Sequence, residues 1–160
     1  MVESKDPEYF RLGNVQLTEL MSATHFSDGS VDEIMQSLSD KGSAPYFIPS
    51  GASTHPLGGL GFARWVFELE VQEAQMDIFF DTIVVAVASG STIAGMVAGC
   101  KLAAQIREAQ GKPEQKRRII GIDALAKPIS ETKDFVLRIA RTTATKIGLP
   151  AEDIAEGTLS

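Results

Sequence analysis

The stretch VASGSTIAGM, residues 87–96, places four small polar or glycine residues between two apolar runs. The run before it, FFDTIVVAVA (79–88), is nearly continuous and rich in β-branched residues, which is typical of a buried strand in a parallel sheet. The run after it has a helical composition and continues to Gly111. The stretch therefore predicts a strand, a tight turn and a helix in succession.

The turn itself has three interpretations. Gly90 permits a backbone conformation that residues with a Cβ resist, and Ser91 or Thr92 can cap the following helix. Backbone N–H groups and the helix dipole would then face an anion, with the hydroxyl of Ser89 as a further donor. A purely structural tight turn uses the same residues. A membrane span over the nineteen uncharged residues 82–100 is disfavoured, because it would leave turn backbone in hydrocarbon.

Composition limits the class of protein. The 160 residues are 44% hydrophobic and 22% charged, as in a globular chain of one domain or two small ones. The net charge of −6 argues against nucleic acid and against an anionic membrane as partners. One cysteine, Cys100, excludes an internal disulfide and is expected to be a small core residue, and two histidines predict no metal site. The polar, acidic N-terminus resembles no signal peptide, so we expect a cytoplasmic protein.

Periodicity and turn residues predict the remaining elements. Ser30 and Ser130 stand where helix N-caps belong. The alternation of strands and helices predicts an α/β fold, with an open, mainly parallel sheet and helices on both faces. A boundary near PSGAS (49–53) would divide the chain into residues 1–50 and 51–160. Helices are expected at 13–23, 31–42, 55–75, 91–111 and 130–148, and strands at 44–50, 79–88 and 117–125.

Two of the expected helices carry more specific predictions. The carboxylates of EVQEAQ (70–75) are expected on a solvated helix face. In GASTHPLGGLGF (51–62), Ser53 or Thr54 caps a helix, or else Ser53 and His55 border a ligand. The apolar stripe of the helix at 55–75 is predicted through Leu60, Trp65, Phe67, Leu69 and Val71, and that of the last helix through Phe135, Val136, Ile139, Ala140 and Ile147.

Several long motifs, taken together, resemble the 1-aminocyclopropane-1-carboxylate deaminases, pyridoxal-phosphate enzymes of the tryptophan-synthase-β fold type. They are PSGASTHPLGGLGF, FFDTIVVAVASGSTIAGM, RRIIGIDALAKP and LRIARTTATKIGL, and the resemblance extends from about Asp6 to Pro150. It implies pyridoxal 5'-phosphate as cofactor, its phosphate bound by the loop Ala88, Ser89, Gly90, Ser91 and Thr92. It further implies a small amino-acid substrate, opened to 2-oxobutanoate and ammonia, and a homodimer for the full-length enzyme.

The chain also departs from this family. The family's cofactor lysine, in a Gly-Gly-Asn-Lys type stretch, has no counterpart here, and Tyr9 and Tyr46 do not match its active-site tyrosines. The chain therefore resembles the middle half of the enzyme: residues 1–50 would end the small lobe, and 51–160 would form part of the large cofactor-binding lobe. No catalytic residue is predicted. A partial deaminase, a D-cysteine desulfhydrase-like enzyme and a catalytically silent phosphate-binding module all remain open.

Overall fold

The computed structural model describes residues 13–26, 28–48, 55–124 and 128–155. The chain divides into two compact units, residues 1–50 and 51–160. The assignment of these units to a small and a large lobe stays a prediction. Predicted site residue Ser53 lies outside the described residues, as does Thr54.

The first unit contains two helices, α1 (Gly13–Leu20) and α2 (Val31–Asp40). The predicted cap at Ser30 is confirmed: its hydroxyl accepts the N–H of Glu33 at 3.2 Å, and its own N–H donates to Glu33 Oε2 at 2.7 Å. This reciprocal pairing satisfies two N–H groups that the helix cannot bond internally. Neither helix contains a buried residue.

The strand predicted at 44–50 is wrong for its described part. Residues 44–48 form no regular structure, and the side chains of Tyr46 and Ile48 are 84% and 74% exposed. Pro45 has no N–H for a strand ladder, and the described residues offer this segment no partner strand. Aromatic and β-branched composition therefore did not suffice to make a strand here.

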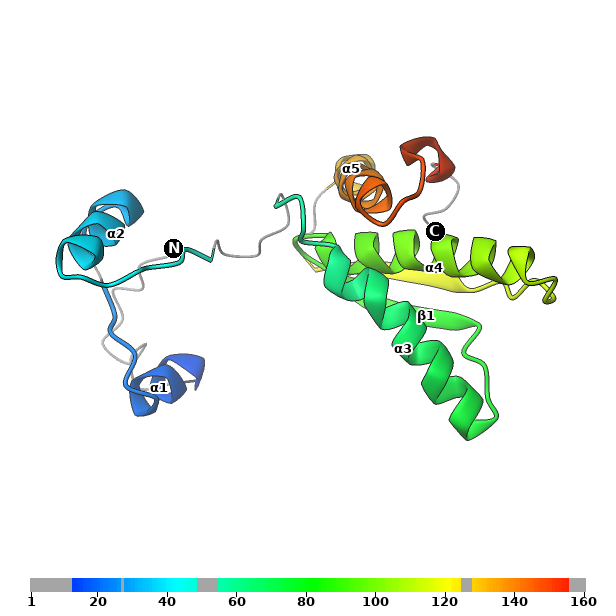
Figure 1. Cartoon of the computed structure of the whole chain (residues 1–160), viewed down its shortest axis with the longest axis horizontal. Coiled ribbons are helices and arrows are strands. Elements are labelled where there is room, and N and C mark those ends of the chain that lie inside the picture. The colour runs from blue at the N-terminus through cyan, green and yellow to red at the C-terminus, as the bar shows by residue number, and fades with distance from the viewer. Residues whose placement is uncertain (1–12, 27, 49–54, 125–127, 156–160) are drawn as a thin grey trace. The chain divides into compact units, whose positions relative to one another are not determined.

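The second unit is built on two parallel strands, β1 (Thr82–Val87) and β2 (Arg118–Asp123), in a register that pairs Thr82 with Arg118 and Val87 with Asp123. Helix α4 (Ser91–Ala109) connects them and lies along one face of the pair (Figure 1). This confirms the predicted strand, turn and helix and the α/β class. It also rules out a continuous helix over 82–100, and none of the described helices could cross a bilayer.

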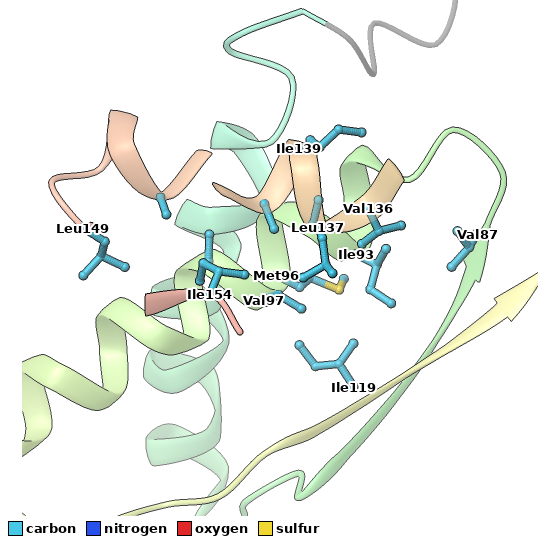
Figure 2. Packing of buried hydrophobic residues seen from close by; sticks show 14 residues of the cluster. Val87, Ile93, Met96, Val97, Ile119, Val136, Leu137, Ile139, Leu149 and Ile154 are labelled. Atoms are coloured by element: carbon cyan, nitrogen blue, oxygen red, sulfur yellow. The ribbon is translucent and has the colours of Figure 1, made fainter. Parts of the chain in front are cut away.

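The core of this unit lies around α4. Every residue from Ile93 to Gly99 is buried, because the strands, α3 (Leu60–Met76) and α5 (Ile129–Lys146) all pack against this helix. Figure 2 shows Val87 and Ile119 of the strands directed toward side chains of α4 and α5. The short 3₁₀ helix η2 (Ala151–Asp153) follows, and Ile154 after it is fully buried.

The start of α5 differs from the prediction, whereas its packing face agrees. The predicted N-cap Ser130 is already inside the helix, which begins at Ile129 after Pro128 and has no side-chain cap. Pro128 is the N-cap, with φ −54° and ψ 131°, and its carbonyl accepts the N–H of Thr132 at 3.1 Å. The residues of the predicted stripe that are buried are Val136, Ile139 and Ala140. The other two, Phe135 and Ile147, are partly buried against the core cluster.

Helix α3 starts later than predicted and buries a face that differs in part from the predicted one. Residues 55–59 form turns, so Pro56 lies before the helix and not in its first turn. The predicted stripe is correct in part: Leu69 is buried, and Trp65 is partly buried against the core cluster. Leu60 and Phe67 are partly buried, and Val71 is exposed. The buried residues are Ala63, Val66, Leu69 and Glu73.

The reason lies in the partner helix. A Cβ added to Gly99 of α4 would lie 2.5 Å from the carbonyl oxygen of Ala63, and one added to Gly95 would overlap the carbonyl oxygen of Gly59. The GxxxG spacing of α4 therefore lets the backbones of the two helices approach closely. The atoms of α3 nearest to these two glycines belong to Phe62, Ala63 and Val66, which places this side of α3 against α4.

One face of the strand pair is covered by α4, and the opposite face carries apolar side chains that the described residues leave bare. Val84 is 64% and Ile122 54% exposed, and Val84 pairs in register with Ile120. Parallel sheets normally have both faces covered. The described part of the chain thus supplies one helical layer of the predicted two.

Candidate cofactor-phosphate site

The turn between β1 and α4 contains the predicted loop Ala88, Ser89, Gly90, Ser91 and Thr92. The N-cap of α4 is Gly90, with φ +80° and ψ −13°, and not Ser91 or Thr92 as predicted. Ser91 is already the first helical residue, because the carbonyl of Gly90 accepts the N–H of Ala94 at 3.0 Å. Glycine is preferred in this left-handed conformation, where a Cβ introduces strain.

The first turn of α4 is rich in hydrogen-bond donors. No side chain caps it, and the N–H groups of Ser91, Thr92 and Ile93 have no acceptor within the helix. The hydroxyls of Ser89, Ser91 and Thr92 stand beside these amides in sequence, and all three residues are partly buried. With the dipole of a 19-residue helix behind them, these groups form a site suited to an anion at the carboxyl end of β1.

Helix α5 closes the back of the turn. A Cβ added to Gly90 would lie 3.1 Å from Val136 Cγ2 and 3.4 Å from Phe135 Cδ1. Gly90 itself is buried. The position therefore disfavours a side chain for two independent reasons, its dihedral angle and its close neighbours.

A hollow of about 250 Å³ lies beside the turn and is lined by Ala88, Gly90 and residues of α5. Its charged residues are Glu131, Asp134 and Arg138, and the Arg138 guanidinium lies 5.4 Å from the centre of the Phe135 ring. Two carboxylates and one guanidinium surround this hollow. The donors of the turn must therefore attract an anion against a net negative local charge.

His55 is not brought to this hollow. It lines a separate hollow of about 230 Å³ with Pro56, and the two hollows share Phe135 and Arg138 as lining residues. Its exposed ring accepts the N–H of Leu57 at Nδ1, 3.2 Å away, and helps to form the turn before α3. The ligand-bordering role predicted for it stays a prediction.

No lysine stands out as a covalent partner among the described residues. Lys133, in the first turn of α5, is exposed, and Lys127 lies outside the described residues. Cys100 packs against the core, as predicted, and its burial raises the pKa of the thiol to about 11. A thiol with this pKa is protonated at neutral pH, which excludes ready use as a nucleophile.

A buried ion pair between Glu73 and Arg117, which was not predicted from the sequence, lies at the amino end of β2. Glu73, predicted to be solvated, is 4% exposed, and its Oε1 and Oε2 accept from Nη1 and Nη2 of Arg117, each at 2.8 Å. Glu73 Oε1 also accepts the N–H of Phe80 at 2.8 Å, and Arg117 donates to the carbonyl of Phe80. The signal was present in sequence, because Glu73 continues the helical spacing of the buried residues Ala63, Val66 and Leu69.

A family profile described as pyridoxal-phosphate dependent enzyme matches residues 2–159. The chain belongs to this family. Pyridoxal-phosphate dependent enzymes act through pyridoxal 5'-phosphate, the cofactor that the sequence motifs had implied.

Individual members of the family carry a more specific name. A 1-aminocyclopropane-1-carboxylate deaminase of Burkholderia cenocepacia is 43% identical and covers 97% of this chain. One from Burkholderia lata is 44% identical over 92% of the chain, and a probable one from Cryptococcus neoformans is 39% identical over 92%. The alignments include only 45%, 43% and 44% of these relatives, so the chain spans less than half their length.

The residues of the turn fit the phosphate of this cofactor. The left-handed Gly90, where a Cβ would meet α5, brings bare backbone to the start of α4, and the uncapped N–H groups suit phosphate oxygens.

Proposed function

We propose that the loop Ala88, Ser89, Gly90, Ser91 and Thr92 binds the phosphate of pyridoxal 5'-phosphate. The observation that carries this proposal is the buried, left-handed Gly90 at the uncapped N-terminus of α4. Ser91 and Thr92 would donate backbone N–H groups, their hydroxyls and that of Ser89 would add donors, and the dipole of α4 would oppose the phosphate charge. Phe135 and Val136 would keep water away from the rear of the turn.

The relatives support a proposal for the whole protein: deamination of 1-aminocyclopropane-1-carboxylate to 2-oxobutanoate and ammonia. Bound pyridoxal 5'-phosphate supplies an electron sink for such chemistry. This chain would contribute phosphate binding. The cofactor lysine and the substrate-binding groups would come from the part of the relatives' length that does not align with this chain. We also propose that the whole protein acts in the cytoplasm as a homodimer on a small amino-acid substrate.

The phosphate proposal is tested with paired glycine substitutions in the 160-residue chain. Gly90→Ala and Gly111→Ala both place a methyl at a positive φ, +80° and +65°, but only the first meets neighbouring atoms. Pyridoxal 5'-phosphate binding is measured by equilibrium dialysis, with inorganic phosphate as competitor. We expect Gly90→Ala to weaken binding by about tenfold or more, since overpacking and strain each amount to about 1 kcal/mol or more, and Gly111→Ala to leave it unchanged.

The same samples separate phosphate binding from catalysis. Borohydride reduction followed by peptide mapping should trap no single lysine in stoichiometric yield, and no 2-oxobutanoate should form from 1-aminocyclopropane-1-carboxylate. Equal binding by the Gly90→Ala chain and the unmodified chain, with circular dichroism unchanged, would contradict the assignment of the loop.

A further inference from the structure

Two residues of α5 pack directly on the turn that we assign to phosphate binding. Val136 is 3% exposed, and its Cγ2 lies nearest to the position that a Cβ of Gly90 would occupy, 3.1 Å away. The ring of Phe135 follows, with Cδ1 at 3.4 Å and Cε1 at 3.6 Å. The turn thus rests against side chains that come from a helix more than forty residues further along the chain.

This helix is itself fixed in place by the core. Leu137, Ala140 and Ala144 are buried in the same cluster as Ile93 of α4, so α5 cannot shift without opening that cluster. Near its C-terminal end, Thr143 lies so close to Gly59 that a Cβ there would overlap its hydroxyl. Close-packed interiors transmit such constraints, because small displacements create voids or clashes.

We propose that Val136, assisted by Phe135, is a positioning residue for the phosphate-binding turn. Contact with Gly90 holds the left-handed conformation, and this conformation sets the directions of the N–H groups of Ser91 and Thr92. Preorganised donors bind an anion more tightly than donors that must first be ordered. The inference rests on the proposed phosphate site and adds to it a role for α5, whose side chains act from behind the turn.

The test uses Val136→Ala in the 160-residue chain, with Leu137→Ala as the matched control. Both residues are buried, 3% and 5% exposed, but Leu137 is directed into the core cluster and supplies none of the atoms nearest to Gly90 (Figure 2). The probes are pyridoxal 5'-phosphate and inorganic phosphate. We expect Val136→Ala to weaken both by about three- to tenfold, and Leu137→Ala by less than about twofold even though it removes more apolar volume.

Two readouts separate positioning from general destabilisation. Amide hydrogen exchange at Ala94, whose N–H bonds to the carbonyl of Gly90 at 3.0 Å, should accelerate without any ligand in Val136→Ala more than in Leu137→Ala. Val136→Ile, which keeps the contact, should preserve at least half of the affinity. If exchange at the Ala94 amide rises equally in both alanine variants, the role proposed for Val136 is overturned.

A double-mutant cycle gives the sharpest outcome. The methyl of Gly90→Ala would press on Val136 Cγ2, and Val136→Ala removes that atom. The loss of affinity caused by Gly90→Ala should therefore be smaller by about threefold or more in the Val136→Ala background, and unchanged in the Leu137→Ala background. Additive losses overturn the positioning role and leave the phosphate site standing. Failure of the unmodified chain to bind either probe overturns both proposals.

Discussion

Replacing Glu73 with leucine should destabilise the second unit strongly. The change removes the three hydrogen bonds at 2.8 Å that the carboxylate accepts from Arg117 and from the Phe80 N–H. It also leaves the Arg117 side chain, which is 7% exposed, with no anion beside it. Breaking a buried ion pair in this way costs about 3–5 kcal/mol.

Arg117 keeps some compensation in the variant. Its guanidinium still lies 4.6 Å from the centre of the Phe79 ring and still reaches the carbonyl of Phe80. A cation–π contact of this kind contributes about 0.5–2 kcal/mol, which places the expected loss near the lower end of the range, at about 3 kcal/mol. Domains are stable by only about 5–15 kcal/mol, so this is a large fraction.

Urea unfolding followed by circular dichroism and by the fluorescence of Trp65 measures the effect. The matched control is the double variant Glu73→Leu with Arg117→Met, which removes both charges and should regain most of the loss. A single variant that costs less than about 1 kcal/mol, or a double variant no more stable than the single one, would refute the reasoning.

The ion pair also predicts a pH dependence. Burial alone raises the pKa of Glu73, but the hydrogen bonds from Arg117 and Phe80 and the Arg117 charge outweigh it, so that the pKa falls below its usual value. The carboxylate therefore stabilises the folded chain above the pKa it has when unfolded. This contribution is lost as the pH falls below about 4, through the lowered folded value. Acid should accordingly destabilise the unmodified chain more than Glu73→Leu.

Three further outcomes are expected. Gly99→Ala should lower the free energy of unfolding by about 1–3 kcal/mol, because its methyl would lie 2.5 Å from the Ala63 carbonyl oxygen. In the same urea titration, Gly61→Ala should be neutral or stabilising, because a methyl there meets nothing within 4 Å. Neutralising Glu131 and Asp134 as Gln and Asn should tighten phosphate binding at low salt, and an equal gain at 1 M salt would contradict an electrostatic cause. Cys100, whose pKa is about 11, should react with a thiol reagent at pH 8 far more slowly in the folded chain than in urea, and equal rates would contradict its burial.

The elements that could be predicted from sequence are those whose signal is local. Two β-branched runs separated by a helix of crossover length were enough to predict β1, α4 and β2 and their parallel pairing. The glycine and hydroxyl residues of the turn likewise marked a candidate anion site. The N-cap residue of α4 could not be predicted from the sequence. Glycine, serine and threonine are all acceptable N-caps, and the backbone angle decides among them.

The features that were predicted wrongly depend on residues that are distant in sequence. The buried face of α3 depends on Gly95 and Gly99 of another helix, because these glycines let the backbones approach closely at Ala63. Glu73 is buried because Arg117, forty-four residues away, accompanies it. The spacing of Glu73 with the buried residues of α3 is visible in the sequence of that helix, but its partner Arg117 is not.

The bare strand face has a practical consequence for handling the protein. Each strand of a two-stranded sheet has an outer edge with unpaired N–H and C=O groups, and here these edges adjoin the exposed side chains of Val84 and Ile122. An apolar strand edge is a template for the strand of another copy, and pairing of this kind propagates without closing. Precipitation at high protein concentration, while the helices are still intact, should therefore limit the shelf life of the purified chain. The substitution Val84→Lys should raise the solubility of the chain, because the charge would extend into water without disturbing the face of the strands that packs against α4.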